Sequence, residues 1–129
     1  TIRSFVTLYQ KKIANMPPNG FKGVCFDGRD ITYNIMPKAD VKFFMTAKIA
    51  VRAKRRYKEL ISQGHNISLV QVHNTIIKRD ESDFKRKISP LKKTRDSILI
   101  DNTNLTINQC FKKMKIFINQ KIKKYEKKN

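Results

Sequence analysis

Val41-Lys42-Phe43-Phe44-Met45 is a short apolar run, and a helical pattern follows it from Thr46 to about Gln63. The run predicts a buried strand, because its length and its aromatic content suit a strand better than a helix. Thr46 can cap the helix that follows, and Gly64 can end it in a left-handed conformation. This strand-then-helix unit indicates an α/β protein.

Two further apolar runs, Gly23–Phe26 and Ser97–Ile100, predict two more strands. Asp27-Gly28 ends the first run and Asp101-Asn102 ends the second, which is typical of strand ends. Long helical segments separate the three runs. Strands that alternate with helices predict a parallel sheet with helices covering both of its faces.

Two capping boxes predict where other helices begin. They are Ser68-x-x-Gln71 and Thr106-x-x-Gln109, in which each side chain pairs with the backbone of the other residue. We expect the helix after Thr106 to fray beyond Lys121. A first helix is expected from Thr1 to about Ala14, and because the chain begins inside this pattern, we expect more sequence upstream.

The composition is strongly basic, with 29 Lys and Arg against 10 Asp and Glu, for a net charge of +19. Such a charge favours polyanionic partners, although lysines spread over a solvated surface would give the same net charge.

Cys25 and Cys110 are far apart and are predicted to be buried free thiols. The sequence has no run of 18 apolar residues and no metal-binding pattern around its two histidines, so we expect a cytoplasmic protein with no membrane partner and no zinc site.

Asp27-Gly28-Arg29-Asp30 directly follows the first predicted strand. Ligands of open α/β sheets bind beyond the carboxyl ends of strands. An arginine there can bind a phosphate through two N–H groups, and the neighbouring aspartate can accept hydrogen bonds from a base or a sugar. The alternative is a solvated turn, which Asp-Gly favours by itself.

Two helical clusters carry further candidate residues. Arg52, Arg55 and Arg56 lie close together on the helix after Thr46, and they could hold phosphate oxygens or form an exposed basic face. Arg79, Asp83 and Arg86 share one helical face, and they could bind phosphates and a sugar hydroxyl or form a surface ladder of ion pairs.

Taken in order, these segments resemble the bacterial cytidylate kinases, a branch of the P-loop nucleoside monophosphate kinases. The resemblance lies in Asp27–Asp30, in Pro37–Ala47 as a P-x-A-x-x-K-x-F strand, in Arg52–Leu60, in Ile77–Arg86 as I-x-x-R-D-x-x-D-x-x-R, in Ser89–Leu91 and in Asp96–Leu105. One departure follows Asp30, where Thr32-Tyr33 replaces the Gly-Thr that the family usually has.

The resemblance implies roles for matching residues. Arg29 would reach the CMP phosphate and Asp30 the base side of the nucleotide, and Asp83 would hold the ribose. The phosphate-transfer residues would be Arg79, Arg86 and the lid residue Arg55, and the residues that bind CMP would be Arg3, Arg29, Asp30, Asp83 and Arg86.

The resemblance also implies the C-terminal part of a P-loop NTPase-like α/β fold. Residues 1–129 would form a partial kinase core with a lid at about 56–82, and the phosphate loop and most of the CMP-binding insertion would lie upstream of Thr1. The implied reaction moves a phosphoryl group from ATP to CMP or dCMP in pyrimidine nucleotide metabolism, with Mg²⁺, in a monomer. No G-x-x-x-x-G-K-[ST] motif occurs in the 129 residues, so this chain alone is expected to be inactive.

The alternative function is a basic nucleic-acid-binding module, which the charge favours. Against it, aromatic residues do not alternate with the basic clusters and no nucleic-acid-binding motif is present. We therefore expect small-molecule substrates and no nucleic-acid partner.

Overall fold

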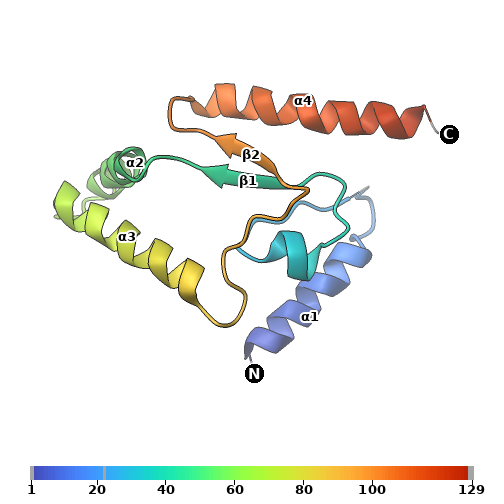
Figure 1. The fold of residues 1–129 in the computed structure, drawn as a ribbon, viewed down its shortest axis with the longest axis horizontal. Coiled ribbons are helices and arrows are strands. Elements are labelled where there is room, and N and C mark those ends of the chain that lie inside the picture. Colours follow the sequence, from blue (N-terminus) through green and yellow to red (C-terminus); the bar gives the residue numbers. More distant parts are fainter. Residues whose placement is uncertain (1, 22, 128–129) are drawn as a thin grey trace.

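A computed structural model describes residues 2–21 and 23–127, without the side chain of Arg3. Four α-helices, one short π-helix and two strands follow each other along the chain (Figure 1). Their bounds are α1 Ile2–Asn15, η1 Ile31–Ile35, β1 Phe43–Thr46, α2 Ile49–Ser62, α3 Leu69–Lys85, β2 Ile98–Asp101 and α4 Ile107–Glu126.

The two strands pair in parallel, which confirms the predicted strand direction. Their register runs from Phe43 opposite Ile98 to Thr46 opposite Asp101. Ile100 lies at the centre of this pairing and has 0% of its surface exposed. The described part of the chain is therefore a mixed α/β structure around a small parallel sheet.

Helix α4 runs alongside the strands (Figure 1). Phe117 of α4 meets Phe43 of β1 edge-to-face, with ring centroids 6.3 Å apart. At the far end of α4 the hydroxyl of Tyr125 hydrogen-bonds to Asp40. This contact anchors the last turns, and the prediction that the helix frays after Lys121 is wrong.

Helices do not cover both faces of the sheet completely. Met45 and Leu99 keep 43% and 50% of their surfaces exposed among the described residues. The prediction of a fully covered sheet is therefore wrong for this part of the chain.

Helix α2 begins later than predicted, because Thr46 belongs to β1 and does not cap it. The residue before α2 is Lys48, whose backbone N–H donates to the hydroxyl of Thr103 at 2.9 Å. Lys48 makes no side-chain cap, and its backbone N–H is instead satisfied by a residue that is 55 positions away. At the other end Gly64 has a φ of +83°, which confirms the predicted left-handed stop.

Helices α2 and α3 pack against each other through Ala53 and Val72, which are 1% and 2% exposed. Both predicted capping boxes are confirmed. The hydroxyl of Ser68 accepts from the backbone of Gln71, and that of Thr106 accepts from the backbone of Gln109.

The predicted strand at 23–26 does not form. Val24 and Phe26 are half-buried in an irregular segment that pairs with neither β1 nor β2. Cys25 points to solvent and Cys110 is half-buried, so the prediction of buried thiols is wrong for Cys25, although both thiols are free.

Among residues 2–21 and 23–127, no helix combines the length and the apolar composition needed to cross a membrane.

Ile100→Ala is expected to lower the free energy of unfolding by about 2–5 kcal/mol, because it leaves a cavity at a fully buried position of β2. Urea denaturation of the parent and the variant measures the difference. Ile107→Ala removes the same atoms from a side chain that is 89% exposed, and it serves as the matched control. Equal losses in the two variants would contradict the core position of Ile100.

Candidate functional site

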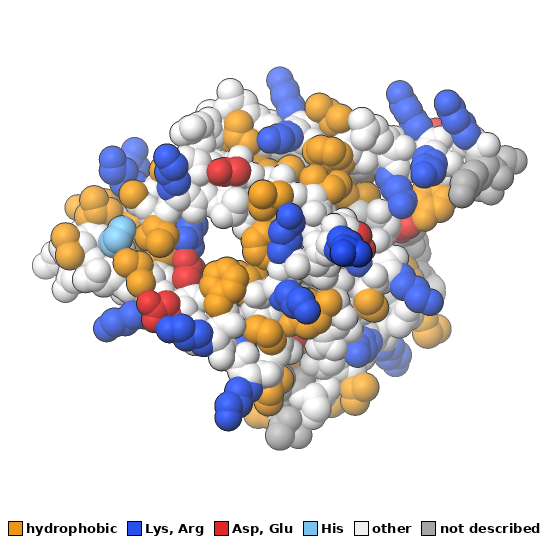
Figure 2. Space-filling view, viewed as in Figure 1, with side chains coloured by type: hydrophobic (Ala, Val, Ile, Leu, Met, Phe, Trp, Pro, Cys, Tyr) orange, Lys and Arg blue, Asp and Glu red, His pale blue; other side chains and the backbone are white. Residues whose placement is uncertain are grey.

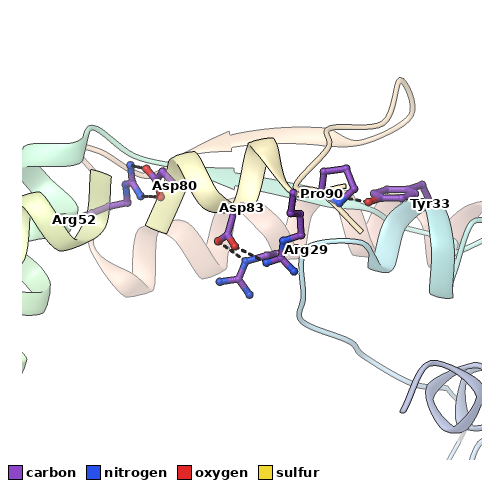
Figure 3. Close-up of polar contacts among 7 residues, drawn as sticks. Arg29, Tyr33, Arg52, Asp80, Asp83 and Pro90 are labelled. Atoms are coloured by element: carbon purple, nitrogen blue, oxygen red, sulfur yellow. Dashed lines mark hydrogen bonds and ion pairs between the residues drawn. The ribbon is translucent and has the colours of Figure 1, made fainter. Parts of the chain in front are cut away.

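The carboxylate of Asp83 joins two arginines from different parts of the chain (Figure 3). Asp83 lies in the last turn of α3 and is only 8% exposed. The guanidinium of Arg86 donates to its Oδ1 at 2.5 Å, and the Nε of Arg29 pairs with its Oδ2. Arg86 comes from the end of the same helix, whereas Arg29 comes from the segment before η1.

Burial alone would raise the pKa of Asp83. The hydrogen bonds and charges of Arg29 and Arg86 outweigh this effect and hold the pKa below its ordinary value of 3.8. Asp83 is therefore ionised at neutral pH. One negative charge then faces two positive charges, and the cluster keeps a net positive charge that suits a phosphate.

Asp30 lies next to this cluster and is the residue that precedes η1. The side-chain amide of Asn34 donates to its Oδ2 at 2.8 Å. Burial acts to raise the pKa of Asp30, but hydrogen bonds from Asn34 and Ser89 and the charge of Arg86 lower it overall. Asp30 is thus a charged acceptor in a fixed orientation beside the two arginines.

A cavity of about 500 Å³ opens on the α2–α3 side of the cluster. Arg29, Arg79 and Asp83 line it, which brings three predicted site residues to one space. Arg79 is exposed and makes no ion pair with the described residues. The remaining lining residues are Arg52, Arg56, Leu60, Ile67, Val72, Thr75, Ile76 and Asp80.

Arg55 lies apart from the other predicted site residues. Its guanidinium donates to the side chain and the backbone carbonyl of Asn102, both at 2.8 Å, and to the carbonyl of Leu105 at 3.2 Å. It lines two other cavities, of about 210 and 540 Å³, and not the cavity beside Asp83. The structure therefore separates Arg55 from Arg79 and Arg86.

Arg52 is engaged within the protein. Its guanidinium binds the carboxylate of Asp80 through two hydrogen bonds of 2.9 and 2.6 Å, and its Nε donates to the carbonyl of Ala47 at 3.0 Å. The hydrogen bond to Asp80 raises the pKa of Arg52. The interpretation of Arg52 as a phosphate ligand is thus less favoured than a role in joining α2 to α3.

The Arg52–Asp80 pair also borders the cavity of about 210 Å³ between α3 and the strands. Figure 2 shows a hollow in this region, with basic and acidic side chains on one side and hydrophobic side chains on the other.

Arg56, the neighbour of Arg55 in the sequence, pairs with Glu59 at 2.7 Å on the surface of α2.

Sequence reasoning missed the contacts made by Tyr33, Asn34 and Ser89. Only the departure from the family pattern at Thr32-Tyr33 marked this region. The side chain of Arg3, the remaining predicted CMP ligand, lies outside the described part of the chain.

Among the described residues, no group of three or more His, Cys, Asp or Glu side chains could hold a metal ion. Mg²⁺ in nucleotide-binding enzymes is held mainly by water, by substrate phosphates and by one or two carboxylates, so it does not need a cage of protein ligands of this kind.

Comparison with known proteins gives a consistent result. A family model described as cytidylate kinase matches residues 1–120. A cytidylate kinase from Carboxydothermus hydrogenoformans is 42% identical over 121 residues, which cover 93% of this chain and 52% of that protein. Cytidylate kinases from Lactococcus lactis and Mycoplasmopsis synoviae are 45% and 43% identical, over 84% and 88% of this chain and 47% and 50% of those proteins. The chain spans about half the length of these curated relatives, and none of these matches favours the nucleic-acid-binding alternative.

Asp83→Asn is expected to lower the free energy of unfolding at neutral pH by about 1–3 kcal/mol, because Arg29 and Arg86 lose the negatively charged partner that they share. The folded-state pKa of Asp83 is lowered, so its stabilisation is full above 3.8 and is lost as the pH falls through the lowered pKa. The difference between parent and variant should therefore shrink as the pH is lowered below 3.8, which urea denaturation at a series of pH values measures.

Asp27→Asn, at an exposed position of the same segment, serves as the control and should show little change. A difference between parent and Asp83→Asn that stays constant from neutral to acid pH would contradict the charge-based explanation.

Proposed function

The chain belongs to the cytidylate kinase family, and from this membership we propose that it supplies the nucleotide-binding arginines of an enzyme that transfers a phosphoryl group from ATP to CMP or dCMP. The observation that carries the proposal is the Arg29–Asp83–Arg86 cluster, beside a cavity that Arg79 also lines. The activity of the whole enzyme is part of the proposal, since the chain spans about half of its relatives.

Phosphoryl transfer depends mainly on positioning and on positive charge around the moving group. We assign Arg29 and Arg86 to the CMP phosphate, because guanidinium groups match phosphate geometry and stay charged. Arg79 would contact the transferred phosphate from the cavity that it lines together with Arg29. Asp83 would keep Arg29 and Arg86 in place and accept a hydrogen bond from the ribose through its remaining lone pairs.

Asp30 is assigned to the base side of CMP, where an ionised acceptor can bind an amino group. Arg55 is assigned to ATP, and its distance from the CMP residues agrees with two substrates that approach from different sides. Arg3 stays a proposed CMP ligand on the basis of the resemblance alone.

The proposed lid, residues 56–82, comprises the second half of α2, the connecting loop and most of α3. Its closure would exclude water, which otherwise would hydrolyse ATP. The rest of the proposal follows from the family: a P-loop NTPase fold completed by the phosphate-loop half, Mg²⁺ bound with ATP, a monomer and a cytoplasmic role in pyrimidine nucleotide metabolism.

The activity is tested by release of ADP from ATP with Mg²⁺ in the presence of CMP, dCMP, UMP or AMP. Residues 1–129 alone are expected to release no ADP, because they contain no phosphate-loop motif. The intact enzyme, meaning this chain joined in one polypeptide to a phosphate-loop half, is expected to use CMP and dCMP in preference to UMP and AMP. The unmatched half of the Carboxydothermus protein can supply that part. Equal rates with all four nucleotides, or no activity from a folded intact enzyme, would refute the proposal.

Asp30→Ala in the intact enzyme is expected to lower kcat/KM for CMP by roughly 10- to 100-fold, as loss of a hydrogen bond to a charged group does. The KM for ATP should change little. Steady-state kinetics with each substrate varied in turn measures both values. Asp27→Ala, at an exposed position three residues earlier, is the control. An equal loss for CMP and ATP would show that Asp30 does not act on the CMP side.

A further inference from the structure

Tyr33 joins two segments that are distant in the sequence. Its hydroxyl donates to the backbone carbonyl of Pro90 at 2.5 Å, across 57 positions of the chain (Figure 3). The contact is partly buried, and burial together with the charge of Asp30 raises the pKa of Tyr33, so the phenol stays protonated and able to donate at neutral pH.

Each end of this hydrogen bond is next to residues of the candidate site. Tyr33 lies in η1, which starts directly after Asp30 and Arg29. Pro90 follows Ser89, which helps to lower the pKa of Asp30, and it lies four residues after Arg86. The hydrogen bond of Tyr33 to Pro90 therefore holds the segment that carries Arg29 and Asp30 against the segment that follows Arg86.

The turn that contains Pro90 has a backbone conformation that is unfavourable by itself. Ser89 has a φ of +53°, in the left-handed region that residues with a side chain rarely adopt. Such conformations persist where surrounding contacts hold them. Two hydrogen bonds hold this turn: that of the Tyr33 hydroxyl to the carbonyl of Pro90, and that of the Leu91 N–H to the carbonyl of Asp83 at 2.7 Å.

We propose that Tyr33 is a positioning residue for CMP, which acts by holding the Ser89-Pro90 turn so that Asp30, Arg29 and Arg86 face one nucleotide. This inference rests on the proposed function. Tyr33 lies at the departure from the family resemblance noted above, where Thr32-Tyr33 stands in place of Gly-Thr. A threonine side chain is too short to place its hydroxyl where the phenolic oxygen lies.

Tyr33→Phe in the intact enzyme tests the proposal, because it keeps the ring and removes only the hydroxyl. The KM for CMP is expected to rise roughly three- to tenfold, as loss of one neutral hydrogen bond predicts, with kcat and the KM for ATP nearly unchanged. Tyr125→Phe removes an equivalent hydroxyl from its contact with Asp40, remote from the site, and is expected to leave all three constants unchanged.

Hydrogen exchange on residues 1–129 gives a readout that needs no activity. The amide of Leu91 should exchange faster in Tyr33→Phe than in the parent, because the turn loses a contact, whereas Tyr125→Phe should leave it unchanged. Faster exchange with an unchanged KM for CMP would reduce Tyr33 to a structural role and overturn the proposal. Unchanged exchange would also overturn it. An intact parent enzyme that does not use CMP would refute the proposed function, and the exchange result would then still report whether the hydrogen bond holds the turn.

Discussion

The candidate site depends on the carboxylate of Asp83, which is held between the guanidinium groups of Arg29 and Arg86. A charge that is 8% exposed is tolerated only where it is paired and hydrogen-bonded. Here the two arginines meet that requirement and are themselves kept close together, in spite of their like charges. Removal of Asp83 would leave two guanidinium groups that repel each other, so the same carboxylate that joins two parts of the fold also holds together the arginines of the proposed site.

Helix α3 connects the segment before η1 to α2 through two aspartates that are three residues apart. Asp83 binds the segment before η1, and Asp80 binds Arg52 of α2 (Figure 3). Because both contacts start from one rigid helix, the position of α2 is linked to the position of Arg29. A movement of the whole of α2 and α3 as one rigid unit would preserve the Arg52–Asp80 pair and would change the contact of Asp83 with Arg29.

Local signals predicted most of what lies close in sequence. The capping boxes at Ser68 and Thr106, the left-handed Gly64 and the shared face of Asp83 and Arg86 all follow from spacings of a few residues. The outcomes that sequence spacing did not show depend on distant residues: Thr103 accepts the N–H of Lys48 before α2, and Asp80 engages Arg52 across 28 positions. The run at 23–26 has the composition of a strand, but neither described strand pairs with it, and composition alone cannot show whether a pairing partner is present.

The arginines of the site differ in how readily they can bind a phosphate. Arg52 would have to give up two hydrogen bonds to Asp80, which would leave that carboxylate without its partner. Arg29 and Arg86 share one carboxylate, so each can keep that contact and still direct further N–H groups to a ligand. Arg79 is exposed and makes no ion pair with the described residues, so it would lose no ion pair among them on binding. The net charge of +19 is shared by the whole chain, so it is this difference in existing partners, more than the number of basic residues, that favours the cavity beside Asp83 as the proposed phosphate site.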